Sequence, residues 1–253
     1  MLSSSFLKSL LLKSLFVSTS SLIFIVSLFS ASSIANSNNQ TNSTRQGLPG
    51  RRISGGVREG NCFKDFNQSL VAIMPRNNLG KTVSARPTFW FSVPATEGET
   101  RAEFQLFDSA DEIAYSTFVN IGEEQGISEF KLPDDIPELT VDETYRWTFS
   151  LGCTDTSQFV VQGWIQRSDM PGSMVQQLED ASSEERAALY SSAGFWYEQV
   201  TELMSLRRNV PTSADFQMEW AELLATAGLT SHVSSNITEA MSAMESYPVL
   251  RGY

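Results

Sequence analysis

The chain has 253 residues, a formal net charge of −11 at pH 7, and a hydrophobic content of 41%. The acidic balance argues against a nucleic-acid-binding protein, because phosphates require an excess of Lys and Arg. Length and hydrophobic content suffice for a β-sandwich of about 100 residues together with a small helical unit.

Residues 1–35 have the pattern of a secretory signal peptide. Lys8 and Lys13 form a positive n-region, residues 15–29 are apolar apart from a few Ser and Thr, and residues 33–35 spell the small-x-small site Ser-Ile-Ala. We expect cleavage before Asn36, because the unbroken apolar run is too short for the alternative, a transmembrane anchor. Loss of two lysines and no acidic residue changes the net charge from −11 to −13. The expected location is the periplasm or the extracellular space.

Residues 36–60 are rich in Asn, Ser, Thr, Arg and Gly, a composition that predicts a flexible linker. Arg51, Arg52 and Arg58 make its end locally basic. Two interpretations stay open for this basic end, a solvated linker and a contact with an anionic surface.

The expected mature chain has two cysteines, Cys62 and Cys153. In an oxidising compartment an even number of cysteines predicts a disulfide bridge between them. The chain-entropy model gives a bridge that closes so long a loop a stabilisation of about 4–5 kcal/mol. Two cysteines and the single histidine, His232, are too few ligands for a structural metal site, so we expect no metal and no cofactor.

Residues 61–168 are expected to form the β-sandwich. Residues 88–93, enclosed by Pro87 and Pro94, are apolar at consecutive positions, which predicts a central strand covered on both faces. We expect Trp90 and Trp147 to lie in the core of the sandwich. Short strands at this spacing, separated by turn residues such as those at 77–80, predict a sandwich or a barrel. The seven expected strands are residues 70–74, 88–93, 102–107, 113–119, 127–132, 144–151 and 159–166.

The corner before the sixth of these strands has the motif Leu139 and Tyr145, followed by Trp147 and Phe149. This motif resembles the corresponding corner of fibronectin type III domains. The resemblance covers residues 67–167. It implies an immunoglobulin/fibronectin III-like sandwich of about seven strands, in which the leucine caps the core and the tyrosine hydroxyl bonds to the upstream backbone. Cys153 departs from the pattern, because fibronectin type III domains usually lack a bridge.

After Arg167 the hydrophobic period changes from 2 to about 3.6, which predicts a small α-helical unit over residues 169–229. Ser182 and Glu185 have the spacing of a capping box, and Gly194 and Gly228 are suited to end helices. The expected helices are residues 171–178, one from the capping box to 193, 195–208, and one from a cap at Thr212 or Ser213 to 227.

The helical unit contains Ala188-Leu189-Tyr190, Gly194, Tyr197 and Pro211 in a helix–turn–helix–proline order. In these residues it is similar to part of a tetratricopeptide repeat. About one and a half repeats are present, fewer than the three or so usually needed to stand alone. We therefore expect the helices to pack on the sandwich rather than to form a free groove. Residues 230–253 are weakly patterned, with at most a last helical turn or two at 237–244.

A set of short motifs recurs in order along the chain, at residues 49–52, 77–80, 86–91, 145–147, 163–164, 188–190, and Gly194 with Trp196-Tyr197. With these motifs the chain as a whole resembles the cyanobacterial family catalogued as domain of unknown function 928, over residues 49–229. The resemblance implies export and a cyanobacterial host, and it supplies no activity and no catalytic residues.

No catalytic set stands out in the sequence. His232 would have to serve any Ser–His–acid triad, and no Gly-x-Ser-x-Gly turn is present. The acidic clusters fall in predicted turns and lack the pattern of a calcium loop, which favours solvated loops over metal ligands. A glycosidase carboxylate pair stays open, because its separation cannot be read from sequence. These clusters are Asp108/Asp111/Glu112, Glu123/Glu124 and Asp134/Asp135/Glu138.

Three further side chains have two interpretations each. Trp164 follows Gly163, where a missing side chain lets backbone or a partner approach, so it could stack on a sugar or pack in the core. Arg86 and Arg146 flank central strands and could form structural ion pairs or an anion site.

These observations favour a non-enzymatic, exported protein-interaction or envelope-associated module with an unknown protein partner. This inference rests on analogy between folds. The alternative is a carbohydrate- or polymer-binding envelope protein, with or without hydrolytic activity, that uses Trp164 or the acidic loops.

Overall fold

The computed structural model describes residues 48–55, 63–65, 67–98, 100–154, 157–210 and 213–233. The expected signal peptide and the C-terminal tail after residue 233 lie outside the described residues. Cys62 and the side chain of Cys153 also lie outside them, so the expected disulfide stays a prediction.

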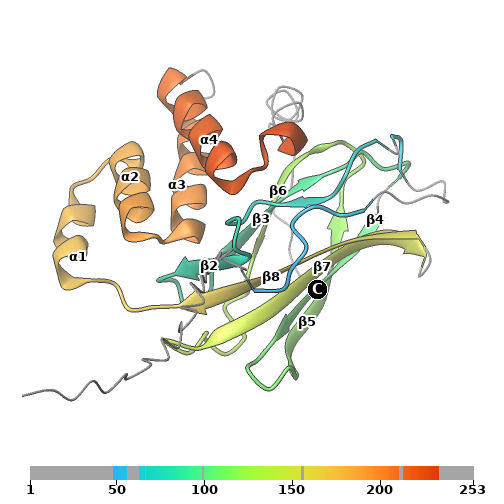
Figure 1. The fold of residues 1–253 in the computed structure, drawn as a ribbon, viewed down its shortest axis with the longest axis horizontal. Coiled ribbons are helices and arrows are strands. Elements are labelled where there is room, and N and C mark those ends of the chain that lie inside the picture. The colour runs from blue at the N-terminus through green and yellow to red at the C-terminus, as the bar shows by residue number, and fades with distance from the viewer. Residues whose placement is uncertain are drawn as a thin grey trace, which may run out of the picture. The chain divides into compact units, whose positions relative to one another are not determined.

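In the described residues, eight strands form two open sheets in a sandwich-like arrangement (Figure 1). One sheet has the order β1-β3-β6, with β1 at Val71–Ala72, β3 at Thr88–Val93 and β6 at Gly126–Lys131. The other has the order β2-β8-β7-β4-β5, and its neighbours are antiparallel except for the parallel pair β2 and β8. Its strands are β2 (Leu79–Thr82), β4 (Thr100–Phe107), β5 (Ile113–Ile121), β7 (Thr144–Thr154) and β8 (Ser157–Arg167).

Aromatic side chains fill the space between the two sheets. Phe91 of β3 stacks on Phe149 of β7 with ring centroids 4.1 Å apart, and Phe104 of β4 meets Phe130 of β6 at 4.4 Å. Trp147 is 1% exposed and belongs to the same cluster. Aromatic pairs of this kind contribute about 0.5–1.5 kcal/mol beyond the area that they bury.

Strand β3 is covered on both faces, as its apolar sequence predicted. Phe89 and Phe91 face the second sheet, whereas Trp90 belongs to a separate cluster with residues of α3 and α4. The expectation that Trp90 lies in the sandwich core was therefore wrong. Side chains alternate along a strand, so Trp90 must lie on the opposite face from its neighbours, where the helices bury it.

Four helices follow the sheets in the part of the chain that the structure describes: α1 (Gly172–Glu179), α2 (Ser183–Ala193), α3 (Trp196–Asn209) and α4 (Ala214–Ala227). Both halves of the expected capping box are present at Ser182 and Glu185. Gly194 and Gly228 end α2 and α4 with φ of 78° and 67°, a left-handed conformation that glycine adopts without steric cost. The cap of α4 is Ser213, whose side chain accepts from the N–H of Phe216.

Helix α3 docks the helical unit on the sandwich, which confirms that the helices pack there. The indole N–H of Trp196 donates to the carbonyl of Ile73 at 2.9 Å, and the ring of Tyr197 lies 5.3 Å from that of Phe89, edge to face. In the opposite direction, from strand to helix, the indole N–H of Trp90 in β3 donates to the hydroxyl of Thr201 in α3 at 3.1 Å.

No described helix has the length and apolar character that crossing a membrane would require.

Two segments differ from expectation. Residues 77–80 were expected to be a turn, and Asn78 does have a φ of 63°, but β2 begins at Leu79. Residues 48–55, expected to belong to a flexible linker, lie against the sheets through bridges from Arg51 to Gln162 and from Ile53 to Val71. Main-chain pairing supplies the stability that this segment's polar composition does not.

Candidate functional site

A groove of about 350 Å³ lies between α2, α3 and α4. Its floor is apolar, since Ala187, Trp196 and Leu223 are all buried. Its walls are mostly polar or acidic and consist of Ala188, Ser191, Ser192, Gln199, Glu219, Glu222 and Thr226. A hollow with an apolar floor and polar groups around it offers both burial and hydrogen bonding to a bound molecule.

The spacing of residues along two helices builds this groove. Glu219, Glu222, Leu223 and Thr226 of α4 stand at i, i+3, i+4 and i+7, so they share one face of the helix. The facing residues of α2, at 187, 188, 191 and 192, are all Ala or Ser. Because these side chains are short, α2 and α4 leave space between them instead of closing over Trp196.

The groove carries negative charge without a lining cation. Burial raises the pKa of the Glu219 carboxyl, and the nearby carboxylates of Glu184, Asp215 and Glu222 raise it further. No residue that lines the groove is Lys or Arg. The nearest basic residue of α2, Arg186, pairs instead with Glu202 of α3 at 3.5 Å. The groove is therefore suited to a cationic group.

A second carboxyl, Glu198, lies where α3 meets the end of β2. Its Oε1 accepts from the hydroxyl of Thr82 at 2.5 Å and from the N–H groups of Val83 and Ser84, each at 3.1 Å. Its Oε2 is buried without a hydrogen-bond partner among the described residues. Burial raises the pKa of Glu198, although the three hydrogen bonds act in the opposite direction. This carboxyl ties the helical unit to the sandwich.

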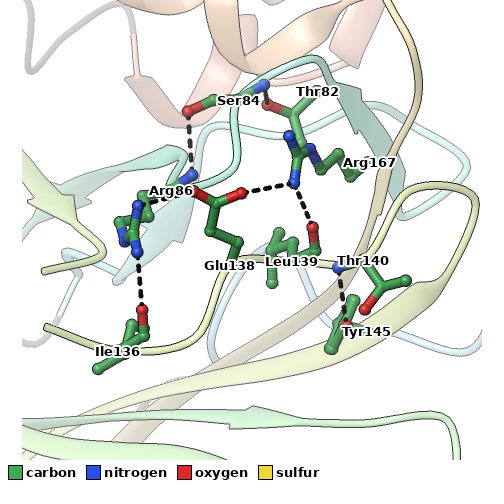
Figure 2. Close-up of polar contacts among 9 residues, drawn as sticks. All are labelled: Thr82, Ser84, Arg86, Ile136, Glu138, Leu139, Thr140, Tyr145 and Arg167. Carbon is green, nitrogen blue, oxygen red and sulfur yellow. Dashed lines mark hydrogen bonds and ion pairs between the residues drawn. The ribbon is translucent and has the colours of Figure 1, made fainter. Parts of the chain in front are cut away.

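Arg86 and Arg167 both pair with Glu138, each with an N···O distance of 3.3 Å (Figure 2). Arg86 also donates to the carbonyl of Ile136 at 3.0 Å, and Arg167 to that of Leu139 at 2.6 Å. These contacts fix the loop before β7 and occupy Arg86, which favours its structural interpretation over an anion site.

In the same loop the hydroxyl of Tyr145 accepts from the N–H of Thr140 at 3.1 Å, as Figure 2 shows. Leu139 beside it is 2% exposed and belongs to the core between the sheets. A leucine in the core and a tyrosine bonded to the upstream backbone are the contacts that the corner motif predicted.

The other predicted charged residues lie in separate places. Arg146 pairs with Asp111 at 2.5 Å and stacks over the ring of Phe107 at 3.7 Å. Asp108 accepts from the N–H groups of Ala110 and Glu112 and so stabilises its own loop. Within the part of the chain that the structure describes, no group of three or more Asp, Glu, His or Cys could hold a metal ion.

Trp164 lies half-buried on the outer face of β8, and its indole N–H donates to the carbonyl of Pro49 at 2.7 Å. The space beside Gly163 is filled by the core, because a Cβ there would lie 2.4 Å from Met74 and 2.7 Å from Trp147. The missing side chain at Gly163 therefore makes room for the core and gives no access to a ligand. His232 follows α4 in a short helical turn, where its N–H donates to the carbonyl of Leu229.

Sequence reasoning missed both the groove and Glu198. The i, i+3, i+4, i+7 set on α4 and the Ala/Ser run on α2 were readable signals for the groove, but their juxtaposition depends on helix packing.

A comparison with family models matches residues 53–237 to the family described as Domain of Unknown Function (DUF928). No curated protein and no solved structure matches the chain.

Proposed function

This chain belongs to the DUF928 family of domains of unknown function, and we propose that it is a non-catalytic interaction module that binds a polypeptide segment in the groove between α2, α3 and α4. The observation that carries the proposal is the combination of an apolar floor at Trp196 with the acidic pair Glu219 and Glu222.

The chemistry of the groove favours a segment with a Lys or Arg anchor. Such side chains lay their methylene stems along apolar surface and keep the charged head near polar groups. Here the stem would lie over Trp196 and Leu223, and the head would reach Glu219 or Glu222. A volume of about 350 Å³ is at the small end of ligand pockets, so the groove accommodates a few anchor side chains of a longer segment.

The proposal is tested by peptide binding measured with fluorescence anisotropy. An array of octapeptides with a central Lys or Arg and apolar neighbours is compared with the same peptides carrying Glu at the centre. We expect the cationic set alone to bind, and the double variant Glu219→Gln/Glu222→Gln to weaken that binding by at least about ten-fold. Added salt should weaken it too, because the groove is open to solvent.

The matched control is Glu179→Gln/Asp180→Asn, which removes the same charge from two exposed residues at the end of α1, outside the groove. It should bind the cationic peptides as the natural chain does. The proposal fails if cationic and acidic peptides bind alike, if no cationic peptide binds, or if both double variants lose binding equally.

Export to the periplasm or envelope of a cyanobacterium is part of the proposed role. Its support is the signal-like sequence at residues 1–35 and the resemblance named above. We also infer kinship of the sandwich with fibronectin type III domains, supported by the Thr140–Tyr145 hydrogen bond, and of α2 to α4 with a partial tetratricopeptide repeat.

The carbohydrate-binding alternative stays a prediction that rests on Trp164. The indole N–H of that residue is engaged by Pro49, which leaves the ring face for a sugar. A glycan array with the natural chain and with Trp164→Ala tests it, and binding lost in the variant would support this alternative.

A further inference from the structure

Strand β5 forms an outer edge of the five-stranded sheet. It pairs with β4 from Thr100↔Ile121 to Phe107↔Ile113, and no described strand pairs with its other side (Figure 1). Its nine residues, Ile113–Ile121, include no charged residue and no proline. The backbone N–H and C=O groups on its outer side therefore form a ladder open for another strand.

The other three edges of the two described sheets are protected in the ways that natural proteins use. Strand β1 has only two residues and is bridged by Ile53. Strand β2 has four residues and carries Lys81. Strand β6 carries Glu129 and Lys131. Among these described edges β5 is the long one without charge, and the register shift between Leu106↔Tyr115 and Phe107↔Ile113 is confined to its first two residues.

Apolar side chains on β5 add to the open ladder. Ile113 is 58% exposed and Phe118 is 43% exposed, and they are two of the five large hydrophobic residues that are exposed in the described part of the chain. The guanidinium of Arg101 lies 3.9 Å from the centroid of the Phe118 ring and holds it against the sheet. An added strand could pack its own side chains on this ring.

Charges at the two ends of β5 select the added strand. Glu112 precedes the strand, and Glu123 and Glu124 follow it; all three are exposed, and Glu123 lies 3.9 Å from the ammonium of Lys64 in a surface ion pair that solvent screens. A second copy paired antiparallel would bring Glu112 of one chain beside Glu123 of the other, and a parallel pair would also align like charges. Like charges side by side on paired strands are destabilising. The edge therefore disfavours self-pairing and favours a strand with basic ends.

We propose that the free edge of β5 is a strand-addition site for an extended segment of another protein, with an uncharged, alternating centre and Lys or Arg at both ends. Main-chain hydrogen bonds to β5 provide the affinity, and the end charges set register and partner choice. This site is separate from the groove of α2, α3 and α4 and uses no residue of it.

The test uses a peptide with a centre of alternating Val and Thr and two lysines at each end. Two N-methylated versions of this peptide are compared with it: one carries the methyl groups on the odd-numbered backbone nitrogens of the centre, the other on the even-numbered ones. In an added strand only one set of N–H groups points at β5. We expect one methylated peptide to lose at least about ten-fold in affinity and the other to bind like the unmethylated peptide. A peptide with glutamate ends should bind more weakly than the lysine version.

Three protein variants locate the site. Asn120→Lys places a lysine on the edge strand, as natural proteins do to prevent another strand from pairing there, and should weaken binding of the unmethylated peptide. Ser173→Lys on α1 adds the same charge elsewhere and should leave binding close to that of the natural chain. Glu219→Gln/Glu222→Gln should also leave it unchanged, so failure of the groove and failure of the edge are distinguishable. Equal binding of both methylated peptides, no binding of any peptide, or a dimer that Asn120→Lys dissociates would overturn the proposal.

Discussion

The indole N–H of Trp147 donates a hydrogen bond to the hydroxyl of Tyr197 across 3.2 Å, deep between the five-stranded sheet and α3. Tyr197 is the residue through which a helix enters the core between the sheets. Burial raises the pKa of its hydroxyl, so the group stays neutral at physiological pH. Sheets and helices therefore share this contact, and we expect them to unfold together.

Tyr197→Phe tests that contact. The variant leaves the Trp147 N–H buried without a partner, which costs about 1–3 kcal/mol of unfolding free energy. Denaturant unfolding followed by circular dichroism measures the loss. Tyr190→Phe is the control, since no hydrogen bond of the Tyr190 hydroxyl to a described residue is recorded, and it should cost clearly less. Equal costs for the two variants would show that the shared bond contributes nothing.

A second prediction concerns Gly80 of β2. A Cβ there would lie 2.5 Å from Cε2 of Tyr197, so Gly80→Ala must displace the ring or the strand. We expect a loss of about 1–3 kcal/mol, as for other overpacked cores. Gly98→Ala is the control because a Cβ at that position meets nothing within 4 Å. A thermal scan in which both variants melt with the natural chain would contradict the close approach.

The helix boundaries could be predicted from the sequence because local residues decide them. Ser182 with Glu185 supplies both halves of a capping box, and Gly194 and Gly228 adopt the left-handed conformation that ends a helix. These signals act within a few residues, so no tertiary information was needed. The pairing of Tyr145 with the upstream backbone was predictable for the same reason.

What escaped prediction depends on contacts between distant residues. Strand β2 is four residues long and contains Gly80, a weak strand former, and it is held by parallel pairing with β8 and by Tyr197. The apolar run of β3 could not say which face the helices cover, so Trp90 was misplaced. The groove exists only once α2 and α4 pack beside α3.

Glu198 predicts a specific pH dependence of stability. Its pKa is raised in the folded state, so the folded chain binds more protons than the unfolded chain between the ordinary glutamate pKa and the raised one. The contribution of Glu198 to stability is therefore greatest below the ordinary pKa and falls as pH rises through this window. Unfolding free energy measured against pH should show this fall.

Glu198→Gln keeps an oxygen for Thr82, Val83 and Ser84 and removes the titration. The difference in stability between natural chain and variant should change in favour of the variant as pH rises through the window. A difference that does not vary with pH would refute the assignment of this slope to Glu198.

The predicted disulfide bridge between Cys62 and Cys153 can be tested by counting free thiols. Phe63 packs on Phe159 with ring centroids 4.2 Å apart, and Phe159 pairs with Leu151, two residues before Cys153. The described neighbours of both cysteines thus meet at one end of the sandwich. We expect no reactive thiol in the unfolded, non-reduced mature protein and two after reduction. A count of two thiols before reduction would contradict the predicted bridge.

The most direct test of the proposed function is to map a bound cationic peptide on the isotopically labelled protein by NMR. The account predicts that shift changes concentrate on the amides of Ser191, Glu222 and Thr226 and the indole of Trp196, which line the groove. Shift changes that leave these groups unaffected while the peptide binds elsewhere would contradict it.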